Sequence, residues 1–312
     1  LLTTNFSGII NDTDGNVLSG VQITIGSQTT ITDQNGVFVI NDASVYENFA
    51  HVTANKSGYI PASRAVVPIQ NSINEIRITL LLKNTIATVT AGEASVVSLP
   101  NGAIVNFTGD FITLAGESYS GEVAVSIHYL PPNQAETFTQ MPGMLYGKRS
   151  DGTATGMETY GMLSVNLYGA NGELLNIDDN TPAILILPVD ASTPNAPENM
   201  PMWYFDETLG FWKEDGFATK VGNNYVAEVT HFTWWNCDFP IDTVNACFQI
   251  KASQKLADFY FKIVKTETSQ WVYTGHTNDS GEACGVFPKD EALTILVYGN
   301  CSNEVIYTQN IG

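Results

Sequence analysis

The sequence predicts an all-β protein built from tandem antiparallel β-sandwich domains. Stretches such as VQITIGSQTTITDQNGVFVI alternate apolar and polar residues, which is the period of a half-buried strand. No long segment has the 3.6-residue period of an amphipathic helix. Pairs that favour tight turns recur between the strand-like stretches, at Asp14-Gly15, Asn35-Gly36, Asn101-Gly102, Asp151-Gly152, Asn171-Gly172 and Ser280-Gly281. Short strands joined by such turns favour sandwiches over barrels.

Two changes of pattern divide the 312 residues into three units. LLKNTIATVTAGEA starts a new pattern near Asn84, and CDFPIDTVNAC carries a proline before a further strand. We therefore expect domains at residues 1–83, 84–240 and 241–312. The outer two look like weak repeats, because TTITDQNGVFVI and YTGHTNDSGEACGVFP both place threonine, an Asn/Asp cluster and glycine before an apolar strand.

Charge and hydropathy exclude two classes of partner. The formal net charge is −19, from 32 acidic against 13 basic residues, which would repel nucleic acid. No apolar run approaches the ~20 residues that cross a bilayer, so we expect no membrane span. The first residues, LLTTNFSGII, are already strand-like and do not form a signal peptide, so we expect a processed or trimmed fragment of something longer.

The first unit resembles the transthyretin-like, carboxypeptidase-regulatory-like domain. The resemblance rests on GIINDTDGNVLSGVQITI, TDQNGVFVI and GYI in that order, over about residues 5–82. It implies a seven-stranded β-sandwich of a kind common in bacterial surface proteins, where it is usually a non-catalytic spacer or binding module. The third unit matches this pattern more loosely, and we expect it to be the incomplete copy, without the final strand.

The middle unit carries two further resemblances, which span nearly all of residues 90–237. VSLPNGAIVNFTGDFITLAGESYSGEVAVSIHYLPP is similar to the opening of a ZU5-like β-domain. MPGMLYGKRSDG, ETYGMLSVNLYGANGELLNI and MWYFDETLGFWKEDG resemble extracellular parts of the astroprincin and cartilage intermediate layer protein families. Both imply an extracellular module rather than a reaction on a small molecule.

His231, Phe232 and Thr233 are the candidate residues for self-cleavage. Some ZU5-containing proteins cut themselves within His-Phe-Ser, and here threonine stands in place of the serine. The resemblance implies that Thr233 attacks the carbonyl of Phe232 while His231 accepts the hydroxyl proton. The alternative, which the alternation of YVAEVTHFTWW favours, is a continuous strand with a hydrogen-bonded histidine.

All four cysteines lie in the last quarter of the chain, and their spacing matches no zinc ribbon. We expect at least one disulfide among Cys247, Cys284 and Cys301, which requires an oxidising compartment. Cys237 would either form a disulfide across the domain boundary near residue 240 or stay free. The alternative is four buried thiols.

Two weaker candidate sites have competing interpretations. Trp203, Trp212, Trp234 and Trp235 would form a ligand platform for carbohydrate if exposed, but the alternation of MWYFDETLGFWKEDG favours a buried core. NDTDGN makes Asp12 and Asp14 weak calcium candidates, although the distal glutamate of a calcium loop is missing and a hairpin turn is favoured. Apart from calcium, we expect no cofactor or metal.

Together these observations predict a non-catalytic extracellular or cell-surface structural or adhesion segment, with filament formation as a variant. The expected partners are other extracellular or cell-surface proteins, copies of the same chain, or glycans. One alternative is a self-processing module that cleaves once at Phe232-Thr233. The other is a carbohydrate- or peptide-binding module of a larger secreted protein.

Overall fold

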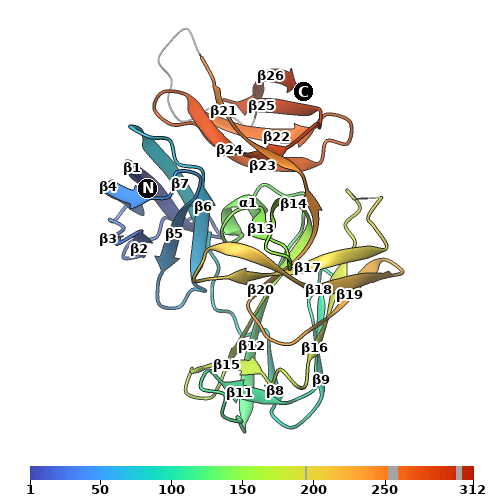
Figure 1. Cartoon of the computed structure of the whole chain (residues 1–312). Helices are drawn as coiled ribbons and strands as arrows, with labels where there is room; N and C mark the ends of the chain where they lie inside the picture. The colour runs from blue at the N-terminus through green and yellow to red at the C-terminus, as the bar shows by residue number, and fades with distance from the viewer. Residues whose placement is uncertain (194, 252–258, 300–303) are drawn as a thin grey trace.

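The computed structural model describes residues 1–193, 195–251, 259–299 and 304–312 (Figure 1). Within these residues the chain forms β-strands throughout and a single four-residue helix, α1 (Thr137–Gln140). The predicted all-β class of antiparallel sandwiches is thus confirmed. None of the described helical structure is long and apolar enough to pass through a lipid bilayer.

The first seven strands form two facing sheets, which we call the N-terminal sandwich. One sheet has the order β4-β1-β7 and the other β3-β2-β5-β6. Side chains that alternate along β1 and β7, such as Phe6, Ile10, Ile76 and Ile78, are at most 2% exposed and fill the space between the sheets. The strands are β1 (Leu2–Asp12), β2 (Gln22–Ile25), β3 (Gln28–Ile31), β4 (Val37–Val45), β5 (Ala50–Asn55), β6 (Ala62–Val66) and β7 (Ile73–Leu80).

The next strands, β8 to β20, belong to a single large sheet, the central sheet. The long strand β14 pairs with both β12 and β20, and it connects the lower lobe in Figure 1 with the region around α1. The strands are β8 (Ala87–Thr90), β9 (Ser95–Ser98), β10 (Ile104–Phe107), β11 (Phe111–Thr113), β12 (Glu122–Leu130), β13 (Tyr146–Lys148), β14 (Ala154–Tyr168), β15 (Leu174–Ile177), β16 (Ala183–Pro188), β17 (Asn199–Asp206), β18 (Phe211–Val221), β19 (Asn224–Val229) and β20 (Trp234–Ile241).

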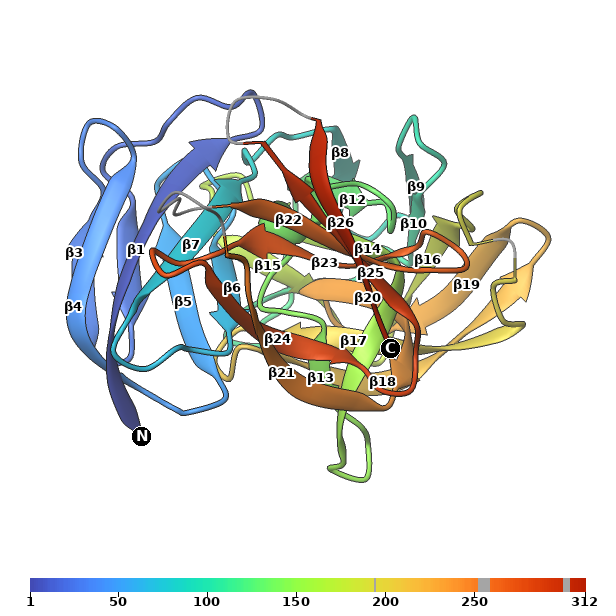
Figure 2. The same ribbon diagram turned by 90° about the horizontal axis from the view of Figure 1, so that it is seen from above.

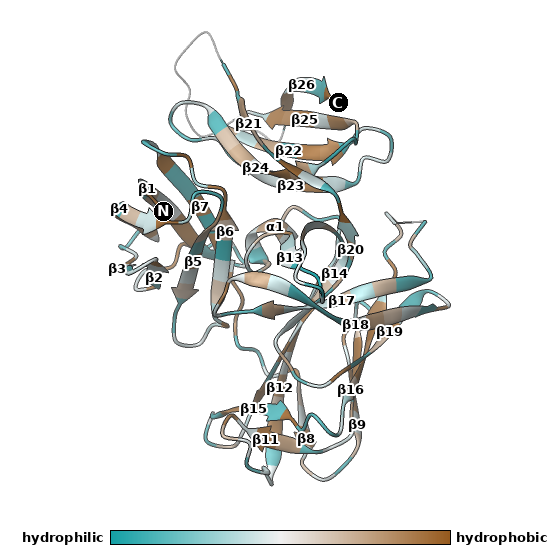
Figure 3. Ribbon diagram, viewed as in Figure 1, coloured by the Kyte–Doolittle hydropathy of each residue, from teal (hydrophilic) through white to brown (hydrophobic). Residues whose placement is uncertain are grey.

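The last strands form the C-terminal sandwich, which lies at the top of Figure 1 and in front in Figure 2. Its sheets are β21-β24 and β23-β22-β25-β26. Strands β22 and β25 are largely apolar (Figure 3), and Phe261, Ile263, Ile295 and Val297 from them are buried. The strands are β21 (Thr243–Gln249), β22 (Tyr260–Lys265), β23 (Trp271–His276), β24 (Glu282–Pro288), β25 (Leu293–Tyr298) and β26 (Val305–Ile311).

The two outer sandwiches share one topology. In each, the first strand pairs antiparallel with the fourth, and the second strand pairs with the third and the fifth. The sixth strand pairs with the fifth. The repeat that the sequence predicts therefore exists in strand order, while the domain boundaries near residues 83 and 240 stay a prediction.

The polar turn before the fourth strand is also the same in both sandwiches. Asp33 Oδ1 accepts hydrogen bonds from the backbone N–H groups two and four residues later, and Asn278 Oδ1 does the same. In both turns the carbonyl of the glycine three residues later accepts a hydrogen bond from a backbone N–H group. Gly36 accepts from Ile10 in β1 at 2.9 Å, and Gly281 accepts from Ile250, directly after β21, at 2.8 Å. These bonds align the two sandwiches residue by residue.

Candidate functional site

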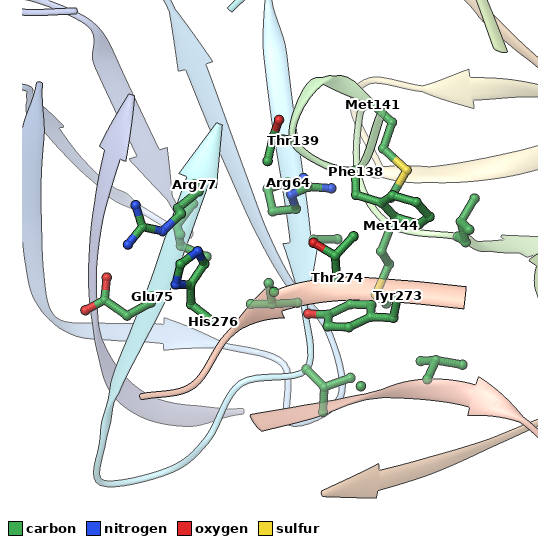
Figure 4. Close-up of a pocket in the computed structure, with 18 of the residues that line it drawn as sticks. Arg64, Glu75, Arg77, Phe138, Thr139, Met141, Met144, Tyr273, Thr274 and His276 are labelled. Atoms are coloured by element: carbon green, nitrogen blue, oxygen red, sulfur yellow. The ribbon is translucent and has the colours of Figure 1, made fainter. Parts of the chain in front are cut away.

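A cavity of about 110 Å³ lies where the N-terminal sandwich, the central sheet and the C-terminal sandwich meet (Figure 4). Strands β6 and β7 line one wall, α1 and the loop after it line the second, and β23 and β24 line the third. Arg64, Phe138 and Tyr273 reach it from these three walls, while Glu75 and Arg77 stand toward one end. We call this region the junction.

Arg64 is the cationic group at the centre of the junction. Its Nη1 donates a hydrogen bond of 3.3 Å to the carbonyl of Gly143, and so ties β6 to the loop after α1. Burial lowers the pKa of Arg64 to about 10, and the neighbouring Tyr273 acts in the opposite direction. The guanidinium therefore stays charged at neutral pH, where it can hold a carbonyl, a carboxylate or a phosphate.

Direct contacts join the N-terminal sandwich to the central sheet. Gly143 N–H donates to Ser63 Oγ at 3.2 Å, and Thr79 Oγ1 donates to Thr139 Oγ1 at 3.0 Å. Ile60 and Leu81 belong to the same buried apolar cluster as Trp203. The two bodies thus share a continuous core, which resists hinge motion more than a polar interface would.

The C-terminal sandwich contacts both other bodies. The ring of Trp271 stacks on that of Phe138 with centroids 6.1 Å apart. Lys265 forms an ion pair with Glu158 of β14, and the two side chains are only 16% and 12% exposed. Asn278 Nδ2 donates to Ser72 Oγ of the N-terminal sandwich at 2.8 Å.

The sequence did not point to the junction residues. Arg64, Phe138 and Trp271 lie in β6, α1 and β23, and no motif surrounds any of them. Only the fold brings these three together, so no local signal could have marked them.

The self-cleavage candidates do not lie in a continuous strand, so the interpretation of YVAEVTHFTWW as one continuous strand is wrong. β19 ends at Val229 and β20 begins at Trp234, so His231, Phe232 and Thr233 occupy the bend between them. The physical reason is Asn176 in β15, which satisfies the backbone of Phe232 in place of a strand partner. Asn176 Oδ1 accepts from Phe232 N–H at 2.7 Å, and Asn176 Nδ2 donates to the Phe232 carbonyl at 3.1 Å.

The hydroxyl of Thr233 and the ring of His231 point to separate partners. Thr233 Oγ1 donates to the carbonyl of Trp234 at 3.1 Å. The His231 ring lies against the rings of Tyr204 and Trp235, with centroids 4.8 and 5.1 Å away. Burial lowers the pKa of His231, with a weaker opposing effect of the Asp215 charge, so the imidazole is neutral at pH 7.

The cysteine prediction is confirmed for one pair. Cys247 and Cys284 face each other across β21 and β24 and form a disulfide. Cys237 is free and buried, so the option of a disulfide across the domain boundary near residue 240 is wrong. Burial raises the pKa of its thiol. Cys301 lies outside the described residues.

The four tryptophans are core residues, and the ligand-platform interpretation is wrong. Trp203 and Trp212 are fully buried, Trp235 is 1% exposed and Trp234 is 4% exposed. Trp235 packs in one apolar cluster and Trp203, Trp212 and Trp234 in another, because β17 and β20 have consecutive buried residues and are covered on both faces. A buried indole has no face to offer a sugar.

The calcium candidates Asp12 and Asp14 belong to a hairpin turn. Asp12 Oδ1 accepts hydrogen bonds from the backbone N–H groups of Asp14 and Asn16, and Oδ2 accepts from Asn16 Nδ2. These bonds, led by the one from the Asn16 side chain, lower the pKa of Asp12. Across the part of the chain that the structure describes, no three His, Cys, Asp or Glu side chains come together as metal ligands.

Comparison with known proteins gives partial matches in sequence. No protein-family model matches the chain. Human cartilage intermediate layer protein 2 is 26% identical over 125 residues, which are 40% of this chain and 11% of that protein. Cartilage intermediate layer protein 1 of Sus scrofa is 29% identical over 121 residues, 38% of this chain and 19% of that protein. The matches thus span a small fraction of these curated relatives.

Solved structures give only distant matches. The TIE protein of Bacillus anthracis has a TM-score of 0.24 at 10% identity, and covers 99% of this chain and 47% of that chain. BcpA, the major pilin subunit of Bacillus cereus, has a TM-score of 0.22 at 8% identity, and covers 99% of this chain and 94% of that chain. Scores of this size support no functional assignment.

Proposed function

We propose that residues 1–312 are a non-catalytic structural or adhesion segment of an extracellular or cell-surface protein. The observation that carries this is the closed set of contacts at the junction, where each of the three bodies contacts the other two. Domains joined in a row can pivot at each linker. Three bodies that touch pairwise can pivot only by breaking two interfaces at once, so the segment is a rigid spacer or platform.

The location is supported by two independent facts. The curated relatives are named for cartilage, a tissue matrix outside cells. The disulfide between Cys247 and Cys284 persists only where thiols are oxidised, as they are in secreted and cell-surface proteins. Other extracellular or cell-surface proteins, or glycans, are therefore the expected partners.

The finer assignment of the three bodies belongs to the same proposal. The two outer sandwiches would be transthyretin-like domains, which their common strand order supports. The central sheet would be a ZU5-like module related to cartilage intermediate layer proteins, which the sequence matches support. The boundaries would fall near residues 83 and 240, in the connections after β7 and around β20.

Rigidity can be tested by small-angle X-ray scattering. The wild-type chain is expected to fit one rigid particle with the three bodies arranged as in Figure 1. The triple variant Trp271→Ala, Lys265→Ala, Ser72→Ala removes the ring stack and the ion pair to the central sheet and the hydrogen bond to the N-terminal sandwich, and its radius of gyration should increase. Glu267→Ala, at an exposed neighbouring turn, is the control and should leave the profile unchanged. A wild-type profile that requires freely moving bodies would contradict the proposal.

Self-cleavage at Phe232-Thr233 is the second candidate function, and one contact favours it. Asn176 Nδ2 donates to the very carbonyl oxygen that would become negative during attack by Thr233. The Thr233 hydroxyl must first leave the Trp234 carbonyl. Its oxygen then bonds to the Phe232 carbonyl carbon while His231 takes the hydroxyl proton. His231 passes this proton to the nitrogen of Thr233, and the Phe232–Thr233 C–N bond breaks to give an ester and a free amine. Water hydrolyses the ester.

Intact mass of the purified protein tests this reaction. If the chain cleaves, fragments 1–232 and 233–312 should form without protease and stay associated, because β20 pairs with both β14 and β17. Thr233→Ala should abolish cleavage, Thr233→Ser should preserve it, and His231→Ala and Asn176→Ala should each slow it by about tenfold or more. A wild-type chain that keeps its full mass in denaturant after long incubation would rule the reaction out.

A further inference from the structure

The C-terminal sandwich has an open position that the N-terminal sandwich fills. In the N-terminal sandwich β1 lies between β4 and β7, antiparallel to one and parallel to the other. Its counterpart β21 pairs with β24 on one side, and no strand of the described residues pairs with its other side. An unpaired strand edge exposes a row of backbone donors and acceptors.

The seventh strand closes the core of the N-terminal sandwich. Residues of β7 run parallel to β1, with Gly8 opposite Ile76 and Ile10 opposite Ile78. The two isoleucines are 1% and 2% exposed, and they cover the side chain of Ile10, which is fully buried. Without β7 this side of the core would face solvent.

The side of the C-terminal sandwich beside β21 does face solvent. Val244, Ala246 and Phe248 of β21 line a groove of about 980 Å³. Val244 is 47% exposed, whereas Thr4, its counterpart in β1, is 3% exposed. Apolar side chains of β22, β24, β25 and β26 also line the groove, among them Ile263, Phe287, Leu293, Ile295 and Ile311. The groove thus opens onto the core at the place where a seventh strand would cover it.

We propose that this groove accepts a β-strand from outside residues 1–312, which pairs in parallel with β21 and completes the C-terminal sandwich. Its side chains at alternate positions must be apolar, because they would lie against Phe287 and Ile295. Beside Phe248 the donated strand must lie farther from β21 than β7 lies from β1. The turn bonds align Phe248 with Gly8, and a side chain at Gly8 would collide with the backbone carbonyl oxygen of Ile76, an atom that any residue in that place would supply.

A second copy of residues 1–312 is the less favoured donor. Each copy carries a formal charge of −19, so two copies repel each other. The strands of the described residues that have the required alternation, such as β7, are already members of sheets. A donated strand would have to leave its own sandwich and expose the core there.

The probe is a capped synthetic peptide with the sequence of Ile73–Leu80, the strand that fills this position in the N-terminal sandwich. Its control has the same residues in an order that places the apolar ones together, so that it lacks alternation. Fluorescence anisotropy of the labelled peptides should show saturable one-to-one binding of the probe and at least tenfold weaker binding of the control. Hydrogen exchange should slow at residues 243–249 when the probe binds.

Variants locate the site. Ala246→Asp places a charge in the groove and should weaken probe binding at least tenfold, while Val96→Asp, at an exposed position of β9, should not change it. If Ala246→Asp does not fold, Val244→Lys tests the same wall. Absence of saturable binding, equal binding of the two peptides, or full binding by a folded groove variant would overturn the proposal.

The oligomeric state of the chain tests whether the strand donor is a second copy. A chain that forms dimers on its own, with slow exchange at residues 243–249 before any peptide is added, would place the donor in a second copy and overturn the proposal as stated. The groove lies away from the contacts that hold the junction together, so failure of peptide binding leaves the scattering result untouched.

Discussion

Replacing Trp203 with alanine is expected to lower the free energy of unfolding of the central sheet by about 3–5 kcal/mol. The indole is fully buried in a cluster with Phe205 and Trp212, so its loss leaves a cavity that the surrounding strands cannot fill. Its Nε1 also donates a hydrogen bond of 3.0 Å to the carbonyl of Asp238, a residue with no exposed surface. The carbonyl would lose this partner, which adds to the cost.

Urea denaturation followed by tryptophan fluorescence and circular dichroism measures this effect. Phe217→Ala is the matched control, because Phe217 is an aromatic residue of the neighbouring strand β18 but is 63% exposed. Its removal should change the free energy of unfolding by less than about 0.5 kcal/mol. Equal losses for the two variants would show that Trp203 is not the core residue that the structure describes.

Removing the disulfide is expected to destabilise the C-terminal sandwich by about 3–4 kcal/mol. The bond closes a loop between residues 37 apart, and it joins β21 to β24, the only strand of the described residues that pairs with β21. The N-terminal sandwich needs no such bond, because β7 holds the other side of β1. The loss should therefore stay local.

Hydrogen exchange with and without reductant measures this loss segment by segment. Exchange should accelerate in residues 243–249 and 282–288 after reduction, while β1 and β7 keep their protection. The variant Cys247→Ala, Cys284→Ala should behave like the reduced wild type and should not respond to reductant. A wild-type chain whose exchange ignores the reductant would refute the stabilising role of the bond.

Cys237 provides an internal control for both experiments. Its thiol is free, buried and of raised pKa, so alkylating reagents should not reach it in the folded protein. Alkylation of Cys237 after mild reduction would mean that the central sheet had also opened. The C-terminal effect could then no longer be read as local.

The sequence by itself determined the all-β class and the repeat of the outer sandwiches. Both depend on local sequence patterns. One pattern is the two-residue period of each strand, and the other is the turns at Asp33 and Asn278, whose side chains accept hydrogen bonds from residues only two and four positions later. The presence of a disulfide was also predictable, because cysteines are few and lie close together in the chain. The pairing was not.

The tertiary structure decided everything that depends on residues far apart in the chain. The bend at Phe232 exists because Asn176, 56 residues earlier, replaces its strand partner. Arg64 meets Gly143 across 79 residues, and no period or turn marks either of them. The open groove beside β21 is likewise a property of strand order. Local patterns show which face of a strand is apolar, but only the packed chain shows whether a neighbour covers that face.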